Sequence, residues 1–152
     1  MSVFDDETKE QAAVGKWIGD RLKAGVQPHE IGVFVRTDDQ LDRAEAAVKA
    51  AGASSVRLSE EVASAIGNVS VGSMHLAKGL EFRAVAVMAC DDEILPLQAR
   101  IEDVADASDL EEVYNTERHL LYVACTRGRD FLSVTGVSPG SEFLDDFGKG
   151  HA

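Results

Sequence analysis

The sequence is poor in cysteine, proline and aromatic residues. It has 152 residues, of which two are cysteine, three are proline and only 6% are aromatic. Cys90 and Cys125 lie far apart in the chain and lack the close spacing of a zinc site or a redox pair, so we expect no metal site. Each follows an apolar stretch, and we therefore expect both thiols to be buried as small hydrophobic groups, as suits a reducing cytoplasm.

Long hydrophobic runs are also absent. The longest, Ala84–Cys90, is far shorter than the roughly 20 apolar residues that cross a bilayer as a helix. Met1 leads into the acidic residues Asp5 and Asp6, rather than into the basic and then apolar run of a secretory leader. We therefore expect a cytoplasmic protein without membrane contact.

Positive charge is in deficit. The chain has 15 lysine and arginine residues against 27 aspartate and glutamate residues, which gives a net charge of −12. Such a surface repels phosphate backbones, so we expect the isolated chain to bind single-stranded DNA only weakly. With 45% hydrophobic residues, residues 1–152 suffice for a single domain with its own core.

Helical and strand patterns alternate along the chain. The expected strands span residues 31–36, 55–58, 69–74, 83–90 and 131–135. The expected helices span residues 8–24, 41–51, 59–66, 109–127 and 142–147, and three of them start near apparent capping boxes at Thr8, Thr37 and Ser108. This alternation predicts an α/β fold, with a mostly parallel sheet between helices on both faces in a three-layer sandwich and a loose tail at residues 148–152.

A polar stretch, SMHLAKGLEF (residues 73–82), lies between two apolar runs. Unpaired polar groups are costly inside a sheet, so this stretch should lie at a sheet edge, where open α/β sheets bind ligands. A solvated surface turn with a Lys78–Glu81 charge pair explains the same residues without any function. The stretch resembles motif V of the UvrD/Rep/PcrA-type superfamily 1 DNA helicases, in which threonine is usual at the position of Ser73.

Arg36 ends an apolar strand and precedes a polar segment, so we expect it to point outward at the carboxyl edge of the sheet. A solvated arginine at a strand end is the simpler interpretation. The segment EIGVFVRTDDQ (residues 30–40) resembles motif IV of the same helicases. This resemblance implies that Arg36 contacts the γ-phosphate of ATP.

Glu117 and Arg127 lie on the longest expected helix. Glu117 falls in the middle of the apolar face, so its carboxylate should be paired, and a structural salt bridge would account for it. Arg127 lies in the last turn, where a cation interacts favourably with the helix dipole. These structural roles need no nucleotide.

The segment ERHLLYVACTRG (residues 117–128) resembles motif VI of the helicases. His119 and Gly128 depart from the usual arginine and alanine, whereas Thr126 and Arg127 match. The resemblance implies that Arg127 is an arginine finger on the γ-phosphate, with Thr126 supporting it. Arginine suits this role because its planar fork stays charged and binds phosphate oxygens in pairs.

The resemblance also implies roles for five residues of the polar stretch. Glu81 would accept hydrogen bonds from the ribose hydroxyls of the nucleotide, with Gly79 beside it. Ser73 and His75 would lie between the nucleotide and single-stranded DNA. Lys78 would order the turn or neighbouring carboxylates.

The sequence contains no Gly-x-x-x-x-Gly-Lys-Ser/Thr loop, so nothing in it cradles the β- and γ-phosphates. Asp91-Asp92 only superficially resembles a magnesium-binding acidic pair. The resemblance covers residues 4–143 and implies the second RecA-like (2A) domain of such a helicase. ATP and Mg²⁺ would be held mainly by a P-loop domain of the same polypeptide. Residues 59–68 stand where many relatives carry a large inserted domain.

Two hypotheses follow. The chain is the C-terminal motor domain of an ATP-dependent DNA helicase, of a kind that acts in DNA repair, and is inactive when isolated. Alternatively, it is a non-catalytic RecA-like interaction domain, for which the acidic surface would favour a protein partner. The presence of Arg36, Glu81 and Arg127 together argues against the second hypothesis, because a non-catalytic copy need not keep all three.

Overall fold

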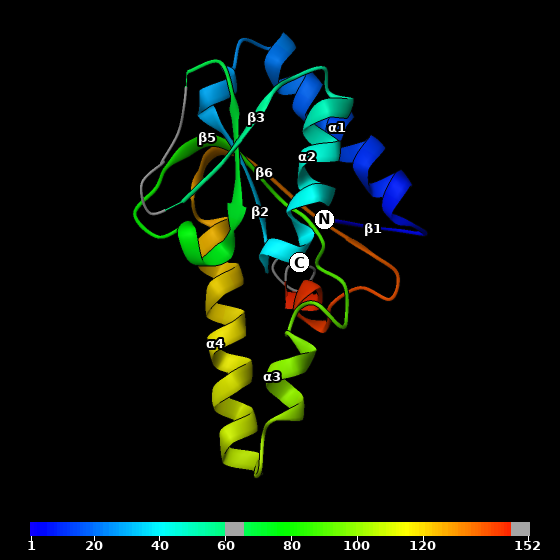
Figure 1. Cartoon of the computed structure of the whole chain (residues 1–152), viewed down its shortest axis with the longest axis vertical. Coiled ribbons are helices and arrows are strands. Elements are labelled where there is room, and N and C mark those ends of the chain that lie inside the picture. The colour runs from blue at the N-terminus through cyan, green and yellow to red at the C-terminus, as the bar shows by residue number, and fades with distance from the viewer. Residues whose placement is uncertain (60–65, 147–152) are drawn as a thin grey trace.

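A computed structural model of the chain describes residues 1–59 and 66–146, and Figure 1 shows its arrangement. Six strands, all paired in parallel, form one sheet in the order β1-β6-β5-β2-β4-β3. The strands are β1 (Ser2–Phe4), β2 (Ile31–Val35), β3 (Ser55–Arg57), β4 (Val69–Ser73), β5 (Phe82–Val87) and β6 (Gly128–Val137). The α-helices are α1 (Glu7–Lys23), α2 (Leu41–Ala50), α3 (Gln98–Glu102) and α4 (Ala107–Cys125). The expected α/β fold with a parallel sheet is confirmed.

Two hydrophobic cores lie on opposite faces of the sheet. On one face, α1 and α2 pack with alternate residues of β2, β4 and β5, such as Val33, Val71 and Ala86. On the other face, α4 packs against the residues between them, such as Phe34 and Val85. Strands buried on both faces are uniformly apolar, which explains why their sequences read as continuous hydrophobic runs.

The helices α3 and α4 extend beyond the sheet as a pair (Figure 1). The pair begins in a segment, residues 91–107, that the sequence suggests is a loop, and α3 is therefore an addition to the expected architecture. Short 3₁₀ turns occupy Pro28–Glu30, Asp38–Gln40, Met74–Leu76 and Glu142–Leu144. The expected helix at 59–66 and the tail at 148–152 fall largely or wholly outside the described residues.

Both long helices begin at an aspartate, not at the expected threonine or serine. The Asp6 carboxylate accepts a hydrogen bond from the Lys9 backbone N–H at 2.8 Å and caps α1. The Asp106 carboxylate caps α4 in the same way, through the Asp109 N–H at 2.9 Å. An aspartate reaches the free N–H groups and also places a negative charge at the positive end of the helix dipole.

Candidate functional site

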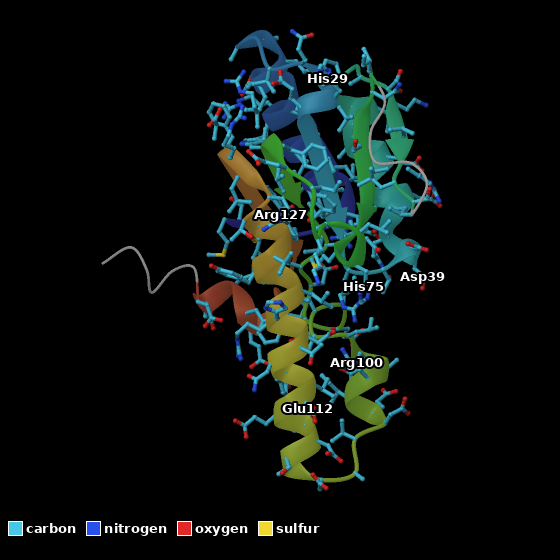
Figure 2. The ribbon with its side chains drawn as sticks, turned by 90° about the vertical axis from the view of Figure 1, so that its left-hand side faces the viewer. His29, Asp39, His75, Arg100, Glu112 and Arg127 are labelled. Atoms are coloured by element: carbon cyan, nitrogen blue, oxygen red, sulfur yellow. The ribbon has the colours of Figure 1, made fainter. Side chains whose placement is uncertain are left out.

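The expected site residues lie at two opposite edges of the sheet. Arg36 and Ser73 stand at the carboxyl ends of β2 and β4, whereas Glu81 and Arg127 directly precede the amino ends of β5 and β6. All strands run in parallel, so the two pairs are separated by the length of β5, about 20 Å for six residues. Figure 2 shows Arg127 at the sheet end of α4, away from His75 and Arg100.

At the carboxyl edge, Arg36 and Glu117 form a buried bidentate ion pair. Arg36 Nε and Nη2 donate to Glu117 Oε1 and Oε2 at 2.8 and 2.7 Å. The same carboxylate accepts from the Leu97 backbone N–H at 2.7 Å and from Arg100 Nη1 at 2.9 Å. Glu117 is 0% exposed and Arg36 is 3% exposed. One carboxylate thus joins β2, the segment before α3, α3 and α4.

The pKa of Glu117 reflects this arrangement. Burial alone raises the pKa, because it disfavours the charged form, but the hydrogen bonds from Arg36, Leu97 and Arg100 and the charge of Arg36 lower it more strongly. The pKa of Glu117 therefore lies below its ordinary value, and the carboxylate is ionised at neutral pH.

Arg36 does not point outward, and in this respect the expectation is wrong. Its guanidinium is buried because the neutralising carboxylate lies inside the domain, on α4. The structure also does not bring Arg36 and Arg127 together. They lie at opposite edges of the sheet, so one γ-phosphate cannot contact both in this arrangement.

His75 is exposed beside the buried pair, and its Nε2 lies 3.1 Å from Arg36 Nη1. It borders a hollow of about 340 Å³ lined by Arg36, Thr37, Asp38, Asp39, Ser73 and His75. Ser73 is 8% exposed at the wall of this hollow. Asp38 and Asp39 place two carboxylates at this hollow, and Figure 2 shows Asp39 near His75.

At the amino edge, three contacts hold residues 80–82 against residues 127–129. The Phe82 N–H donates to the Arg127 carbonyl at 2.9 Å, and Arg127 Nη1 lies 3.5 Å from the Leu80 carbonyl oxygen. Arg129 Nη1 lies 3.8 Å from Glu81 Oε1. The structure therefore brings together Glu81 and Arg127, two of the residues expected at the nucleotide.

The Arg127 side chain folds back on the end of its own helix. Its Nε donates to the Val123 carbonyl at 3.2 Å, and its Nη2 donates to Thr126 Oγ1 at 3.2 Å. Thr126 Oγ1 in turn donates to the Val123 carbonyl at 2.9 Å. Two of these contacts satisfy the Val123 carbonyl in the last turn of the helix, and Arg127 remains partly exposed at the surface.

Gly79 and Lys78 belong to the turn that leads into β5. Gly79 has a φ of 82°, in the left-handed region that favours glycine, so a side chain here would strain the turn. Lys78 is exposed, and within residues 1–59 and 66–146 it has no ion pair with a carboxylate. The expected ordering of neighbouring carboxylates by Lys78 therefore has no counterpart in the described part of the chain.

A second buried polar network was not anticipated from the sequence. Arg43 donates to Glu10 at 2.6 Å and to both oxygens of Asp91 at 2.9 and 3.0 Å. Glu10, at 0% exposure, also accepts from the Thr135 hydroxyl and the Ala89 N–H at 2.8 and 3.0 Å. Asp91 is thus engaged with Arg43 rather than arranged as a magnesium ligand. The sequence feature that could have revealed this network is the presence of charged residues, Glu10 and Arg43, within the apolar faces of α1 and α2.

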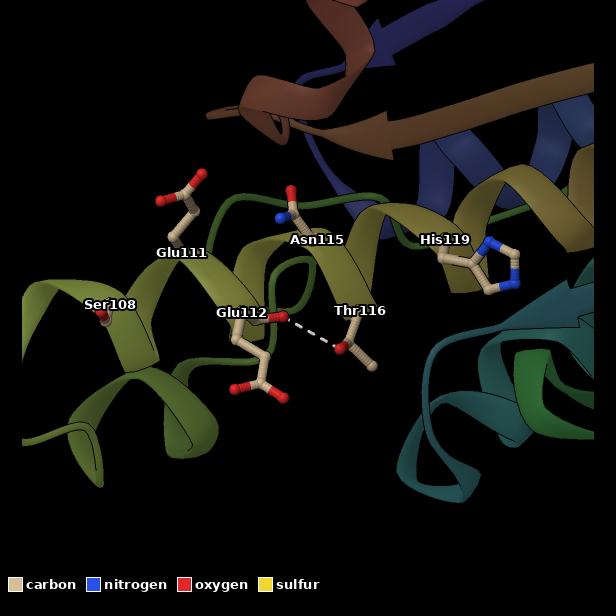
Figure 3. A pocket seen from close by; sticks show the side chains of 6 residues that line it. All are labelled: Ser108, Glu111, Glu112, Asn115, Thr116 and His119. Carbon is tan, nitrogen blue, oxygen red and sulfur yellow. Dashed lines mark hydrogen bonds between the residues drawn. The ribbon is translucent and has the colours of Figure 1, made fainter.

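A further hollow of about 450 Å³ lies along α4, lined by Ser108, Glu111, Glu112, Asn115, Thr116 and His119. Figure 3 shows that every one of these residues comes from this single helix, where Thr116 donates to the Glu112 carbonyl. The hollow is far along the helix from Arg127, and we assign it no role in the site (Figure 2).

In the part of the chain that the structure describes, no three side chains of histidine, cysteine, aspartate or glutamate are grouped so as to hold a metal ion. No helix there combines the length and the apolar character needed to cross a membrane.

The chain is similar to known helicases. It is 37% identical to the ATP-dependent DNA helicase UvrD2 of Mycobacterium tuberculosis over 75 residues, which cover 47% of this chain and 10% of UvrD2. It is 36% identical to the ATP-dependent DNA helicase PcrA of Staphylococcus epidermidis over 70 residues, which cover 46% of this chain and 9% of PcrA. The matches thus span about a tenth of the length of these relatives.

The fold is also similar to a solved structure. The crystal structure of the C-terminal domain of a possible DNA helicase from Lactobacillus plantarum WCFS1 superposes with a TM-score of 0.60 at 22% identity, covering 94% of this chain and 75% of that one. Residues 48–138, more than half of the chain, match the model of the UvrD-like helicase C-terminal domain. The chain belongs to the family of UvrD-like helicase C-terminal domains.

Proposed function

We propose that the chain is the C-terminal motor domain of an ATP-dependent DNA helicase, and that ATP binds between its amino-edge site and a P-loop domain of the same polypeptide. The amino-edge site consists of Gly79, Glu81, Thr126 and Arg127. The observation that carries the proposal is the hydrogen bond from the Phe82 N–H to the Arg127 carbonyl, which holds the segments of Glu81 and Arg127 side by side.

The residues of this site suit the two ends of a nucleotide. Glu81 is exposed, and its carboxylate can accept hydrogen bonds from two ribose hydroxyls at once. Arg127 carries a charge that can stabilise the negative charge shifting on the γ-phosphoryl group during hydrolysis. The P-loop domain supplies the phosphate cradle and Mg²⁺, and this domain supplies the finger.

Arg127 has to leave its present partners to act as a finger. Its guanidinium now contacts neutral acceptors on Val123, Leu80 and Thr126. Hydrogen bonds from a guanidinium to phosphate oxygens are stronger than those to neutral acceptors, so a γ-phosphate presented by the P-loop domain can draw the side chain away. Thr126 then remains to satisfy the Val123 carbonyl.

We assign Arg36 a positioning role instead of a phosphate contact. Its buried pair with Glu117 fixes α4 against β2, and its Nη1 contact with His75 fixes the turn after β4. In this proposal His75 and Ser73 face the DNA track at the carboxyl edge. Arg36 and Glu117 connect that track to α4, whose last residue lies two positions before Arg127.

The test compares Arg127→Ala and Arg127→Lys in the full-length protein encoded by this reading frame. Loss of a finger should lower the ATPase kcat by about 10³-fold or more, with little change in nucleotide affinity. Lysine should restore little, because an ammonium cannot reproduce the paired fork. Arg118→Ala, which removes an exposed arginine from the same helix, is the control and should keep normal turnover.

A different result would favour the non-catalytic alternative. If Arg127 only satisfies the helix end, Arg127→Ala should lower the melting temperature, lysine should substitute well and turnover should be nearly kept. Single-turnover hydrolysis and thermal melts on the same variants distinguish the two patterns.

A further inference from the structure

We infer that Arg129 is a positioning residue for Glu81, and that a glycine-dependent bulge in β6 directs it there. The inference rests on the proposed function, because it assigns the way in which the ribose-binding carboxylate is held. The motif resemblances give neither Arg129 nor this bulge a role at the nucleotide.

The bulge is visible in the pairing of β5 with β6. Phe82 pairs with Gly128, but the next partners are Ala84 and Phe131. Two steps along β5 therefore correspond to three steps along β6, so the extra residue of β6 lies between Gly128 and Phe131. A bulge of this kind bends the strand and re-aims the side chains at it, and such bulges are common beside functional sites.

Gly128 is required for this geometry. A Cβ atom built on Gly128 would lie 2.6 Å from the Phe131 carbonyl oxygen and 3.2 Å from Val85 Cβ. The first contact is with backbone, so it cannot be relieved by a side-chain rotation. Only glycine therefore permits the close approach of residue 128 to the Phe131 carbonyl. Motif VI usually has alanine at this position.

The bulge places Arg129 and Asp130 in a row of charges at the amino edge. Arg129 Nη1 faces Glu81 Oε1 at 3.8 Å, and Arg129 Nε faces Asp130 Oδ1 at 3.7 Å. On its other side, Asp130 accepts from Arg83 Nε at 3.0 Å. Arg129 thus stands between two carboxylates, and one of them is the residue assigned to the ribose.

This row contributes little to stability. The side chains of Arg129 and Glu81 are 56% and 67% exposed, and exposed pairs of this kind are weak. The Arg129–Glu81 contact is longer than a hydrogen bond, and among the described residues no donor hydrogen-bonds the Glu81 carboxylate. Glu81 is therefore oriented by a nearby charge while both of its oxygens remain able to accept ribose hydroxyls.

The experiment measures KM and kcat of the full-length protein for ATP and for 2′,3′-dideoxy-ATP, which has no ribose hydroxyl to offer Glu81. Arg129→Ala should raise the KM for ATP by about threefold, the effect of losing one exposed charge contact, and leave kcat unchanged. The KM for the dideoxy nucleotide should not change. Arg129→Lys should restore most of the ATP affinity, because the role needs charge and not a fork.

Arg83→Ala is the matched control, since it removes a neighbouring arginine that pairs with Asp130 and not with Glu81. It should leave the ratio of the two KM values unaltered. The inference is overturned if Arg129→Ala leaves the ratio of the two KM values unaltered. An equal rise in both KM values would mean that Arg129 contacts phosphate or acts on the fold. No change in either KM value would mean that Arg129 does not act on Glu81. Loss of turnover in Arg127→Ala, measured beside these variants, shows that the proposed function survives such a failure.

Discussion

The Glu117 carboxylate is fully buried and accepts four hydrogen bonds. Because no water can replace a lost donor, the charge of this carboxylate depends on all of them. Removing Arg36 would leave a buried carboxylate with only Leu97 and Arg100. Breaking a buried pair by removing one partner costs about 3–5 kcal/mol of unfolding free energy. We therefore expect Arg36→Ala to be strongly destabilising in urea unfolding of the isolated chain.

Arg118→Ala is the comparison for this prediction, because Arg118 forms an exposed pair with Asp146. Its loss should cost under about 1 kcal/mol. If Arg36→Ala instead unfolds like the unaltered chain, the buried pair does not have the structural role assigned to it, and a nucleotide contact for Arg36 regains support.

The lowered pKa of Glu117 also predicts a dependence of stability on pH. A carboxyl group whose folded pKa is depressed contributes stability that is fully present above its ordinary value of 4.5. That contribution is lost as the pH falls through the folded pKa. The difference in unfolding free energy between the unaltered chain and Glu117→Gln should be constant from pH 7 to about 5.5 and shrink in more acidic solution. A difference that is the same at pH 7 and pH 3 would contradict this assignment.

The two cysteines are buried, as the sequence predicts, and should be unreactive in the folded chain. Burial raises the pKa of Cys125 to about 12 and the pKa of Cys90 well above its ordinary value. Only the thiolate reacts readily with alkylating agents. Iodoacetamide at pH 8 should therefore label neither thiol quickly in the native chain and both quickly in urea, as mass spectrometry would show. Rapid native labelling of Cys90 would mean that the core opens there.

The residue that caps a helix can be tested on α4. Asp106 caps α4, whereas Ser108 lies inside its first turn and makes no cap. Asp106→Ala should cost about 1 kcal/mol of stability, the usual loss for a helix cap. Ser108→Ala should change stability by less than about 0.5 kcal/mol. The reverse order in urea unfolding would support the capping box that the sequence suggests.

Strands were easier to predict than helix starts or partners. Residues 31–35 and 84–87 are buried on both faces, so their sequences are uniformly apolar and their identity as strands is clear. The three residues of β1 are too few to show a pattern, and they form a strand because β6 offers a free edge. The sequence does not single out Asp6 and Asp106, each two residues before an apparent capping box, because several kinds of side chain can cap a helix.

Partners of charged residues could not be predicted in the same way. Local patterns require Glu117 to be paired, but its partner Arg36 lies 81 residues away in the sequence. Strand order decides that contact, and alternation of helices and strands leaves strand order open. The motif resemblances therefore assign both Arg36 and Arg127 to the γ-phosphate. Only the strand topology shows that Arg36 lies at the carboxyl edge of the sheet and Arg127 at the amino edge.

At the scale of the whole molecule, the domain has half of each site that it is proposed to form. Glu81 and Arg127 approach a nucleotide from one side, and the sequence has no P-loop to hold its phosphates. A few such contacts give an affinity near the millimolar range, about −4 kcal/mol. The purified isolated chain should therefore not hydrolyse ATP at a measurable rate. Steady turnover that Arg127→Ala abolishes would contradict the half-site proposal.

The net charge of −12 sets the last expectation, which concerns DNA. The hollow beside Ser73 and His75 has Asp38 and Asp39 on its rim, so the proposed track carries no excess of positive charge in this domain alone. Aromatic residues on which bases could stack are also few. The isolated chain should bind a labelled single-stranded oligonucleotide more weakly than about 1 μM at physiological salt, and modest added salt should abolish the binding.

Charge reversal by Asp38→Lys with Asp39→Lys should strengthen binding and steepen its salt dependence, whereas the same reversal at Glu111 and Glu112, on the outer face of α4, should have a smaller effect. Equal gains from the two pairs would show that net charge alone governs binding, and the track would then have to lie elsewhere.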